Sequence, residues 1–195
     1  MSEIVPRWEW RAFGTDFGEA EARFANLGVE AVQESDETYL LSPASDETVK
    51  IRAELMDIKK LVETNDAGLE QWRPVMKQGF PIPLVDVAKV CAELKVTPPE
   101  PGRDALSLDE LLALLEMPER GIRAVAVHKR RVRYTINGCT SEVTDVIADG
   151  KRVRTVAIES EDADRVVSAV EKMGLSAYPN VSYPRWLKSA FGMGS

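Results

Sequence analysis

Charged side chains alternate with apolar ones along several short stretches of this sequence. The alternating charged or polar residues are Arg7, Glu9 and Arg11; Lys50, Arg52 and Glu54; Gln71 and Arg73; Lys129, Arg131 and Arg133; Glu142; and Glu159. Successive side chains of an extended strand point to opposite faces, so each stretch has one charged face. Arginine and lysine match phosphate oxygens, and carboxylates bind Mg²⁺ or Mn²⁺. The pattern therefore indicates a site for polyphosphate chemistry. The alternative is that these charged faces simply point to solvent.

Other chemistries find less support. His128, the single histidine, alternates away from Lys129 and Arg131, and we expect it to be structural. The sequence contains neither GxxxxGK[ST] nor GxGxxG, which argues against P-loop and Rossmann nucleotide sites. Cys91 and Cys139 lie far apart without metal-ligand spacing, so we expect two buried thiols.

Composition limits the class of protein and its partners. The 195 residues are 44% hydrophobic and 29% charged, which is typical of a globular protein. The net charge of −7 argues against nucleic acid as a partner, and no apolar run approaches the ~20 residues of a membrane span. The first ten residues lack the pattern of a secretory signal. We therefore expect one cytoplasmic domain over residues 1–195 that binds a phosphate-rich small molecule, and a homodimer is left open.

The elements that would position these residues follow from periodicity and turn signals. The patterns predict strands over 5–13, 37–42, 47–63, 69–81, 123–136, 140–148 and 151–160, and helices over 16–27, 85–94, 106–117, 161–175 and 183–192. Ser107 and Glu110 form a potential capping box, and Asp149-Gly150 favours a hairpin turn. Residues 97–105 form a Pro-rich linker. This order predicts an α+β fold with an antiparallel sheet.

The series of charged strands resembles the CYTH domain, the triphosphate tunnel metalloenzyme superfamily of bacterial adenylate cyclases, thiamine-triphosphatases and inorganic triphosphatases. Its Glu-x-Glu-x-Lys strand is similar to residues 7–11, and its Lys/Arg-x-Arg strands are similar to 50–52 and 129–131. Its Asp-bearing and Glu-x-Glu strands are similar to 142–145 and 157–159. The resemblance covers nearly the whole chain, in the family's order. It implies an eight-stranded antiparallel β-barrel with helices packed outside and a triphosphate bound in its tunnel.

The resemblance also implies roles for individual residues. The substrate-binding residues would be Arg11, Lys50, Arg52, Arg73, Lys129, Arg131 and Arg133. Glu9 and Glu159 would be catalytic, and Glu9, Asp145 and Glu159 would hold Mg²⁺ or Mn²⁺. The implied function is metal-dependent hydrolysis of an organic or inorganic triphosphate.

Two residues depart from the family pattern on the metal side. Arg7 and Ala157 stand where the family has glutamates, and a cation beside a divalent ion reverses an attraction. A catalytically impaired polyphosphate- or nucleotide-binding protein of the same fold is therefore the alternative. The register of strand 140–148 is also open, because either Glu142 with Thr144 or Val143 with Asp145 could face the ligand.

Overall fold

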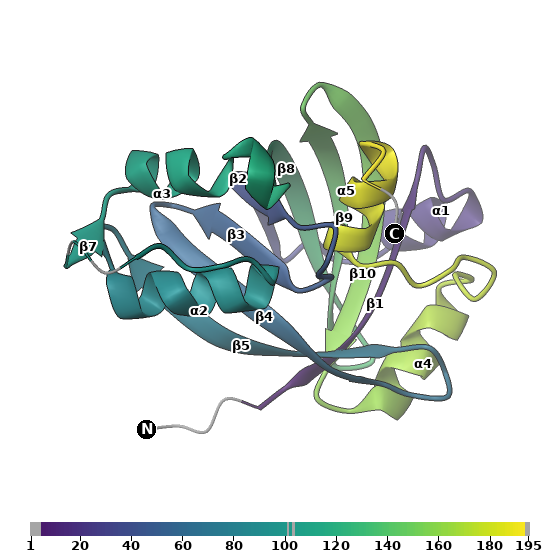
Figure 1. Ribbon diagram of the computed structural model, residues 1–195. Helices are drawn as coiled ribbons and strands as arrows, with labels where there is room; N and C mark the ends of the chain where they lie inside the picture. Colours follow the sequence, from purple (N-terminus) through teal and green to yellow (C-terminus); the bar gives the residue numbers. More distant parts are fainter. Residues whose placement is uncertain (1–4, 101, 103, 194–195) are drawn as a thin grey trace. The chain divides into compact units, whose positions relative to one another are not determined.

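The structure is a computed structural model that describes residues 5–100, 102 and 104–193 (Figure 1). Its elements in chain order are β1 (Arg7–Gly14), α1 (Glu19–Ala25), β2 (Ala31–Leu41), β3 (Thr48–Arg52), β4 (Leu55–Thr64), β5 (Glu70–Gly79), β6 (Ile82–Pro83), α2 (Leu84–Leu94), β7 (Ala105–Leu106), α3 (Leu108–Leu115), a 3₁₀ turn (Pro118–Arg120), β8 (Arg123–Ile136), β9 (Cys139–Ala148), β10 (Lys151–Ser160), α4 (Ala163–Lys172) and α5 (Tyr183–Ala190).

Eight of these strands close into an antiparallel barrel. Their order is β1-β10-β9-β8-β2-β3-β4-β5, and β5 pairs with β1 to complete the ring. Strands β6 and β7 form a separate two-stranded sheet. The predicted α+β fold with an eight-stranded antiparallel barrel is confirmed.

Tight turns set the register of the hairpins. Asn137-Gly138 and Asp149-Gly150 both have positive φ angles, as two-residue turns between antiparallel strands require. The predicted hairpin at Asp149-Gly150 is therefore confirmed. The capping box is confirmed as well, because Ser107 and Glu110 each accept a hydrogen bond from the other's backbone N–H.

The chain divides into two compact units, each with its own apolar core. Unit 1 contains the described parts of 1–35, 61–73 and 128–182, and unit 2 those of 36–60, 74–127 and 183–195. In unit 1, Trp10 and Ile158 of the sheet pack with Phe24 of α1 and Val166 of α4. The single domain over residues 1–195 stays a prediction.

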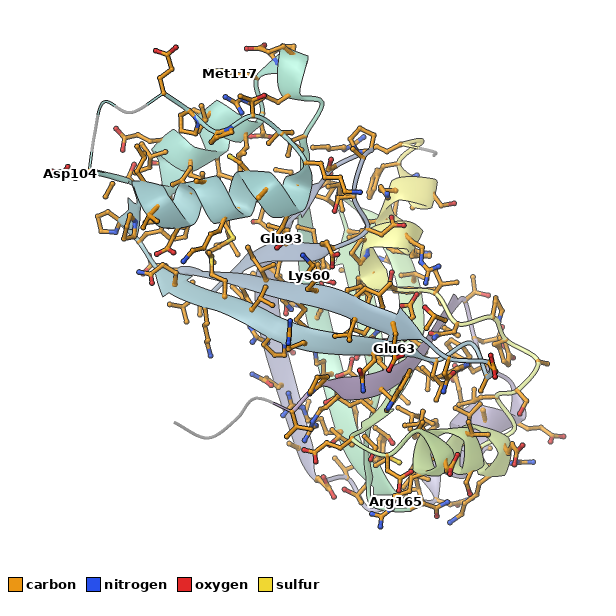
Figure 2. All side chains as sticks on the ribbon, turned by 60° about the horizontal axis from the view of Figure 1, so that its bottom comes forward. Lys60, Glu63, Glu93, Asp104, Met117 and Arg165 are labelled. Carbon is orange, nitrogen blue, oxygen red and sulfur yellow. The ribbon has the colours of Figure 1, made fainter. Side chains whose placement is uncertain are left out.

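Unit 2 builds its core from helices α2 and α3 against strands β3 and β4. Ile58, Val90 and Leu111 are fully buried there. At the margin of this core, Lys60 of β4 forms an ion pair of 3.3 Å with Glu93 of α2 (Figure 2). Cys91 is buried in this unit and Cys139 in unit 1, and both thiols are free, as expected.

The structure differs from the predicted elements mainly in β2, which begins six residues earlier than expected. Residues 31–36 are largely exposed, and most of them are polar. Their sequence therefore lacks the alternation of apolar residues by which a strand is predicted. The predicted linker has no helix between 97 and 104, although Pro101 and Arg103 lie outside the described residues. No helix in the described part of the chain is both long and apolar enough to cross a membrane.

Candidate functional site

Strand β1 sorts its charged and apolar side chains onto opposite faces. Trp10 and Ala12 pack into the core beneath α1 and α4, so Glu9 and Arg11 point to the other face. We call this the inner face of unit 1. The opposite face, which α1 and α4 partly cover, is its outer face.

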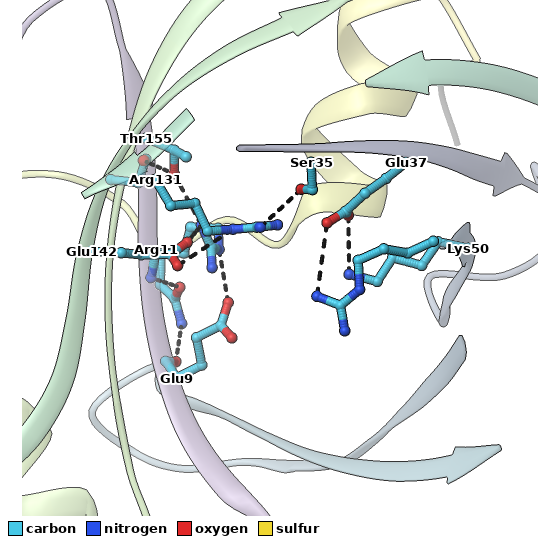
Figure 3. Close-up of polar contacts among 11 residues, drawn as sticks. Glu9, Arg11, Ser35, Glu37, Lys50, Arg131, Glu142 and Thr155 are labelled. Carbon is cyan, nitrogen blue, oxygen red and sulfur yellow. Dashed lines mark hydrogen bonds and ion pairs between the residues drawn. The ribbon is translucent and has the colours of Figure 1, made fainter. Parts of the chain in front are cut away.

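Arg11 is the centre of a charged network on the inner face (Figure 3). Its Nε donates to Glu9 at 2.8 Å, and its NH1 group donates to Glu142 of β9 at 3.1 Å. NH1 also lies 3.4 Å from the Thr155 hydroxyl of β10. The guanidinium is buried and oriented by three strands, which restricts its rotamers before any ligand arrives.

Glu142 joins Arg11 to a second arginine. Its other carboxylate oxygen lies 3.6 Å from Nε of Arg131, which also donates to Ser35 of β2 at 2.9 Å. Burial alone would raise the pKa of Glu142, but the charges of Arg11, Arg131 and Lys129 outweigh it and hold that pKa below its usual value. Glu142 therefore remains ionised. We refer to Glu9, Arg11, Lys129, Arg131 and Glu142 together as the Arg11 cluster.

Two threonines lie beside this cluster as a cross-strand pair. Thr155 pairs in register with Thr144, and its hydroxyl donates to the Ala12 carbonyl at 2.7 Å. The Thr144 hydroxyl is fully buried and has no hydrogen-bond partner among the described residues. An unsatisfied buried hydroxyl costs about 1–3 kcal/mol. Thr144 alternates onto the same face as Glu142, so its hydroxyl is a donor that a ligand could engage.

An asparagine that follows α4 fixes the backbone of β1 at the cluster. Asn180 accepts from the Arg11 backbone N–H at 2.8 Å and donates to the Glu9 carbonyl at 3.2 Å. The pairing of β1 with β5 covers Arg7 to Glu9, and the two Asn180 bonds hold the β1 backbone from Glu9 to Arg11. Asn180 was not predicted, because nothing local in its loop indicates this role.

Three glutamates lie side by side on neighbouring strands. Glu9 pairs in register with Glu159 of β10 on one side and with Glu70 of β5 on the other. Glu159 accepts from Arg7 at 3.1 Å, and Glu70 is buried. The sequence placed Glu70 in a strand, but its proximity to Glu9 depends on the pairing that closes the barrel.

These carboxylates do not fit a resident divalent cation as they are arranged. In the described part of the chain, no three histidine, cysteine or acidic side chains converge closely enough to hold a metal ion. The carboxylate of Glu9 is ion-paired with Arg11, and that of Glu159 is ion-paired with Arg7. The oxygen donors suit Mg²⁺ or Mn²⁺ in type, but Glu9 and Glu159 would each have to exchange an arginine for the cation.

Asp145 lies on the outer face, away from Glu9 and Glu159. It forms an ion pair with Arg154 of β10 at 2.8 Å, and Arg154 also contacts Glu21 of α1 at 2.7 Å. The open register of this strand is thereby resolved in favour of Glu142 and Thr144 on the inner face. The structure does not bring Asp145 together with the other two predicted metal ligands.

The remaining predicted residues of unit 1 differ in position. Lys129 and Arg131 are buried on the inner face, and Arg133 follows them on the same side of β8 by strand alternation. Arg73 is exposed and alternates away from Glu70, which faces Glu9. Arg73 is therefore not placed with the Arg11 cluster.

Unit 2 contains a second charged group, the Lys50 cluster of Glu37, Lys50, Arg52 and Asp57. Lys50 donates to Glu37 at 3.0 Å, and Arg52 lies 4.0 Å from Glu37 and 3.5 Å from Asp57 (Figure 3). Burial lowers the pKa of Lys50, and the adjacent Arg52 lowers it further, although Glu37 and Asp57 oppose the shift. Glu37 and Asp57 were not predicted, yet both lie opposite the basic pair in register.

This chain is similar to known proteins in structure but not detectably in sequence. No sequence model of a known family matches this chain, and no curated protein does. A putative adenylyl cyclase from Hippeastrum, described as having a dominant triphosphatase activity, matches with a TM-score of 0.52 at 10% identity. That match covers 95% of this chain and 96% of the Hippeastrum protein. The fold is CYTH-like.

Two further structures match at lower similarity. A putative adenylate cyclase from Bacillus halodurans has a TM-score of 0.49 at 11% identity, covering 92% of this chain and 97% of that one. A conserved hypothetical protein from Pyrococcus furiosus has a TM-score of 0.49 at 16% identity, with 86% and 91% covered.

Proposed function

We propose that this protein binds the phosphate chain of a triphosphate-containing substrate, organic or inorganic, at the Arg11 cluster and hydrolyses it. The observation that carries the proposal is the network in which Glu142 bridges Arg11 and Arg131 on the inner face. Arginine presents a rigid fork of donors that matches phosphate oxygens. The triphosphatase activity of the Hippeastrum protein, which shares the fold, supports hydrolysis as the reaction.

Binding would proceed by an exchange of partners within the cluster. Arg11, Lys129 and Arg131 are cationic, whereas Glu9 and Glu142 are anionic, so much of the positive charge is already neutralised. A triphosphate that arrives with its divalent cation offers phosphate oxygens to the arginines and a positive charge to the carboxylates. Both sets of side chains can then exchange one counter-charge for another, which limits the cost of leaving buried charges unpaired.

Hydrolysis would rely on position and charge more than on covalent chemistry. Phosphoryl transfer is accelerated chiefly by aligning water with the phosphorus and by stabilising charge on the transferred group. Arg11 and Arg131 would stabilise that charge, while Glu9 and Glu159 would orient the water. The Thr144 hydroxyl would donate to a phosphate oxygen and thereby satisfy its own hydrogen bond.

A second candidate function is binding without turnover. Arg7 forms an ion pair of 3.1 Å with Glu159, and Ala157 pairs in register with Arg11 and with Glu142. A guanidinium thus lies beside a carboxylate that hydrolysis needs. This arrangement favours a polyphosphate- or nucleotide-binding protein that holds its ligand without a metal.

Calorimetric titration of tripolyphosphate, once with Mg²⁺ and once with EDTA, separates these functions. Metal-dependent binding followed by phosphate release supports the hydrolase, and binding that is unaffected by EDTA supports the binder. Glu9→Ala should abolish turnover but barely weaken metal-free binding, with Glu19→Ala, at an exposed position of α1, as the matched control. Absence of saturable binding in both buffers would overturn both functions and leave only the fold.

A further inference from the structure

A cavity of about 470 Å³ that is lined by three arginines lies on the outer face of strands β8, β9 and β10 in unit 1. Its charged and polar lining residues are Thr15, His128, Arg130, Asp145, Arg152 and Arg154, and Ile147 supplies apolar surface. His128 and Arg130 alternate with Lys129 and Arg131 along β8, and Asp145 alternates with Glu142 and Thr144 along β9. The cavity therefore faces away from the Arg11 cluster and is a distinct site.

Arg154 is held in place as part of the cavity wall. It donates to Asp145 at 2.9 Å and to Glu21 at 2.7 Å, so two carboxylates neutralise it and fix its orientation. Arg154 therefore forms part of the cavity wall but leaves little positive charge for a ligand.

Two other basic side chains of the cavity lie near a third carboxylate. Arg130 and His128 share one carboxylate, Glu34 of β2, at 3.9 Å and 4.0 Å. Arg152 forms no ion pair or hydrogen bond with any other side chain that the structure describes. Arg152 is therefore the arginine of this cavity that no carboxylate among the described residues neutralises.

An adjoining hollow extends the cavity toward an apolar surface beneath α1. This hollow, of about 200 Å³, shares Arg130, Asp145 and Arg154 with the cavity and is also lined by Val132 and Val143. Ligand pockets commonly have volumes of about 300–1,000 Å³ and combine apolar walls with a few polar groups. A ligand here would meet arginines at one end and valine side chains at the other.

We propose that this outer cavity is a second anion site, which binds the phosphate group of a small organic phosphomonoester. Arg130 and Arg152 donate to the phosphate oxygens, and His128 supplies a further donor. The organic part of the ligand lies against Val132 and Val143. The arginines occupy adjacent parts of a single sheet and do not form an extended stripe, which suits a small molecule better than a nucleic acid.

The test is a titration of the ¹⁵N-labelled full chain, followed by backbone amide NMR shifts at constant ionic strength. The probes are AMP, as an organic phosphomonoester, and inorganic phosphate. We expect saturable shifts over residues 145–147 and 152–154, with AMP binding more tightly and also shifting Val132 and Val143. Equal affinity for AMP and inorganic phosphate, with no shift near the valines, would overturn the organic ligand.

Arg152→Gln should weaken AMP binding roughly tenfold or more, because it removes a charge-assisted hydrogen bond. Arg165→Gln, which removes an exposed arginine on α4 outside the cavity (Figure 2), should leave the affinity unchanged. Tripolyphosphate binding at the Arg11 cluster should survive Arg152→Gln, so the two sites can fail independently. Equal losses in the two variants, or shifts confined to residues 129–133 and 142–144, would contradict an outer site.

Discussion

The Arg11 cluster and the Lys50 cluster contain similar charges but hold them in different ways. In the Arg11 cluster the carboxylates of Glu9 and Glu142 are 15% and 17% exposed, and Arg11 bridges them. In the Lys50 cluster the Glu37 side chain is 0% exposed, and Lys50 donates to it at 3.0 Å. Buried charges are costly unless they are paired, so the loss of a cation should cost more at the fully buried Glu37 than at the partly exposed Glu9 and Glu142.

This difference indicates that the clusters serve different purposes. Removing one cation from the Arg11 cluster leaves Glu142 with another, so its pairs can be exchanged for a ligand. Removing Lys50 takes a hydrogen-bonded cation away from a carboxylate that is not exposed to solvent. We therefore expect the Arg11 cluster to determine ligand binding and the Lys50 cluster to determine stability.

The largest expected effect is on the stability of the Lys50 cluster. Lys50→Met should lower the free energy of unfolding by about 3–5 kcal/mol, the usual cost of breaking a buried ion pair. Urea denaturation would measure it. Lys60→Met, which breaks the more exposed pair with Glu93, should change stability by at most about 1 kcal/mol. A similar small loss in both variants would erase the proposed difference between the clusters.

The next effect is on ligand affinity at the Arg11 cluster. Arg11→Met should weaken tripolyphosphate binding by roughly 30-fold or more, because truncating a buried charged partner costs about 2–5 kcal/mol. Titration calorimetry would measure the change, with Arg165→Met on α4 as the control for net charge. If Lys50→Met, in a folded preparation, lost more affinity than Arg11→Met, the assignment of binding to the Arg11 cluster would be reversed.

The two clusters should also give stability its pH dependence in opposite ranges. The pKa of Glu142 is lowered on folding, so its contribution is present above the ordinary value of 4.5 and is lost as pH falls through the folded value. The pKa of Lys50 is lowered from 10.5, so the unfolded chain binds more protons at alkaline pH and stability rises with pH there. A neutral Lys50 amine can still hydrogen-bond Glu37, which Met cannot.

Urea midpoints measured across pH would resolve the two contributions. Glu142→Gln should flatten the acidic slope alone, and Lys50→Met should flatten the alkaline slope alone. Flattening of the same slope by both variants would show that the clusters do not titrate separately.

The smallest expected effect concerns the two faces of β9. Asp145→Asn should change stability by about 1 kcal/mol or less, since its pair with Arg154 is at the surface, and should leave tripolyphosphate binding intact. Glu142→Gln, three residues away on the same strand, should alter tripolyphosphate binding measurably. Loss of metal-dependent turnover in Asp145→Asn would instead restore the ligand role that the sequence suggested.

Local patterns predicted much of the fold and one side of the site. Trp8 and Trp10 alternate so clearly with Glu9 and Arg11 that the charged face of β1 follows from sequence alone. Strand β9 offered no such guide, because Glu142 and Asp145 lie on opposite faces and both faces carry apolar residues. Only the pairing of β9 with its neighbours settles which carboxylate faces the cluster.

The residues that prediction missed depend on long-range pairing or lie in loops. Glu70 reaches Glu9 only because β5 pairs with β1, and Asn180 reaches β1 from a segment without regular structure. Glu37 lies in a strand whose first half is polar and exposed. No local periodicity encodes such contacts, because they arise from the topology.

The pairing of β1 with β10 has a consequence for synthesis of the chain. Arg11 meets Thr155, 144 residues later, so the first strand emerges from the ribosome long before its partner exists. At roughly 5–20 residues per second, β1 would wait about 7–30 s for the strand that pairs along its full length. Nascent chains of this protein should therefore be substrates for chaperones that hold apolar segments, and β1 should acquire its protection late in translation.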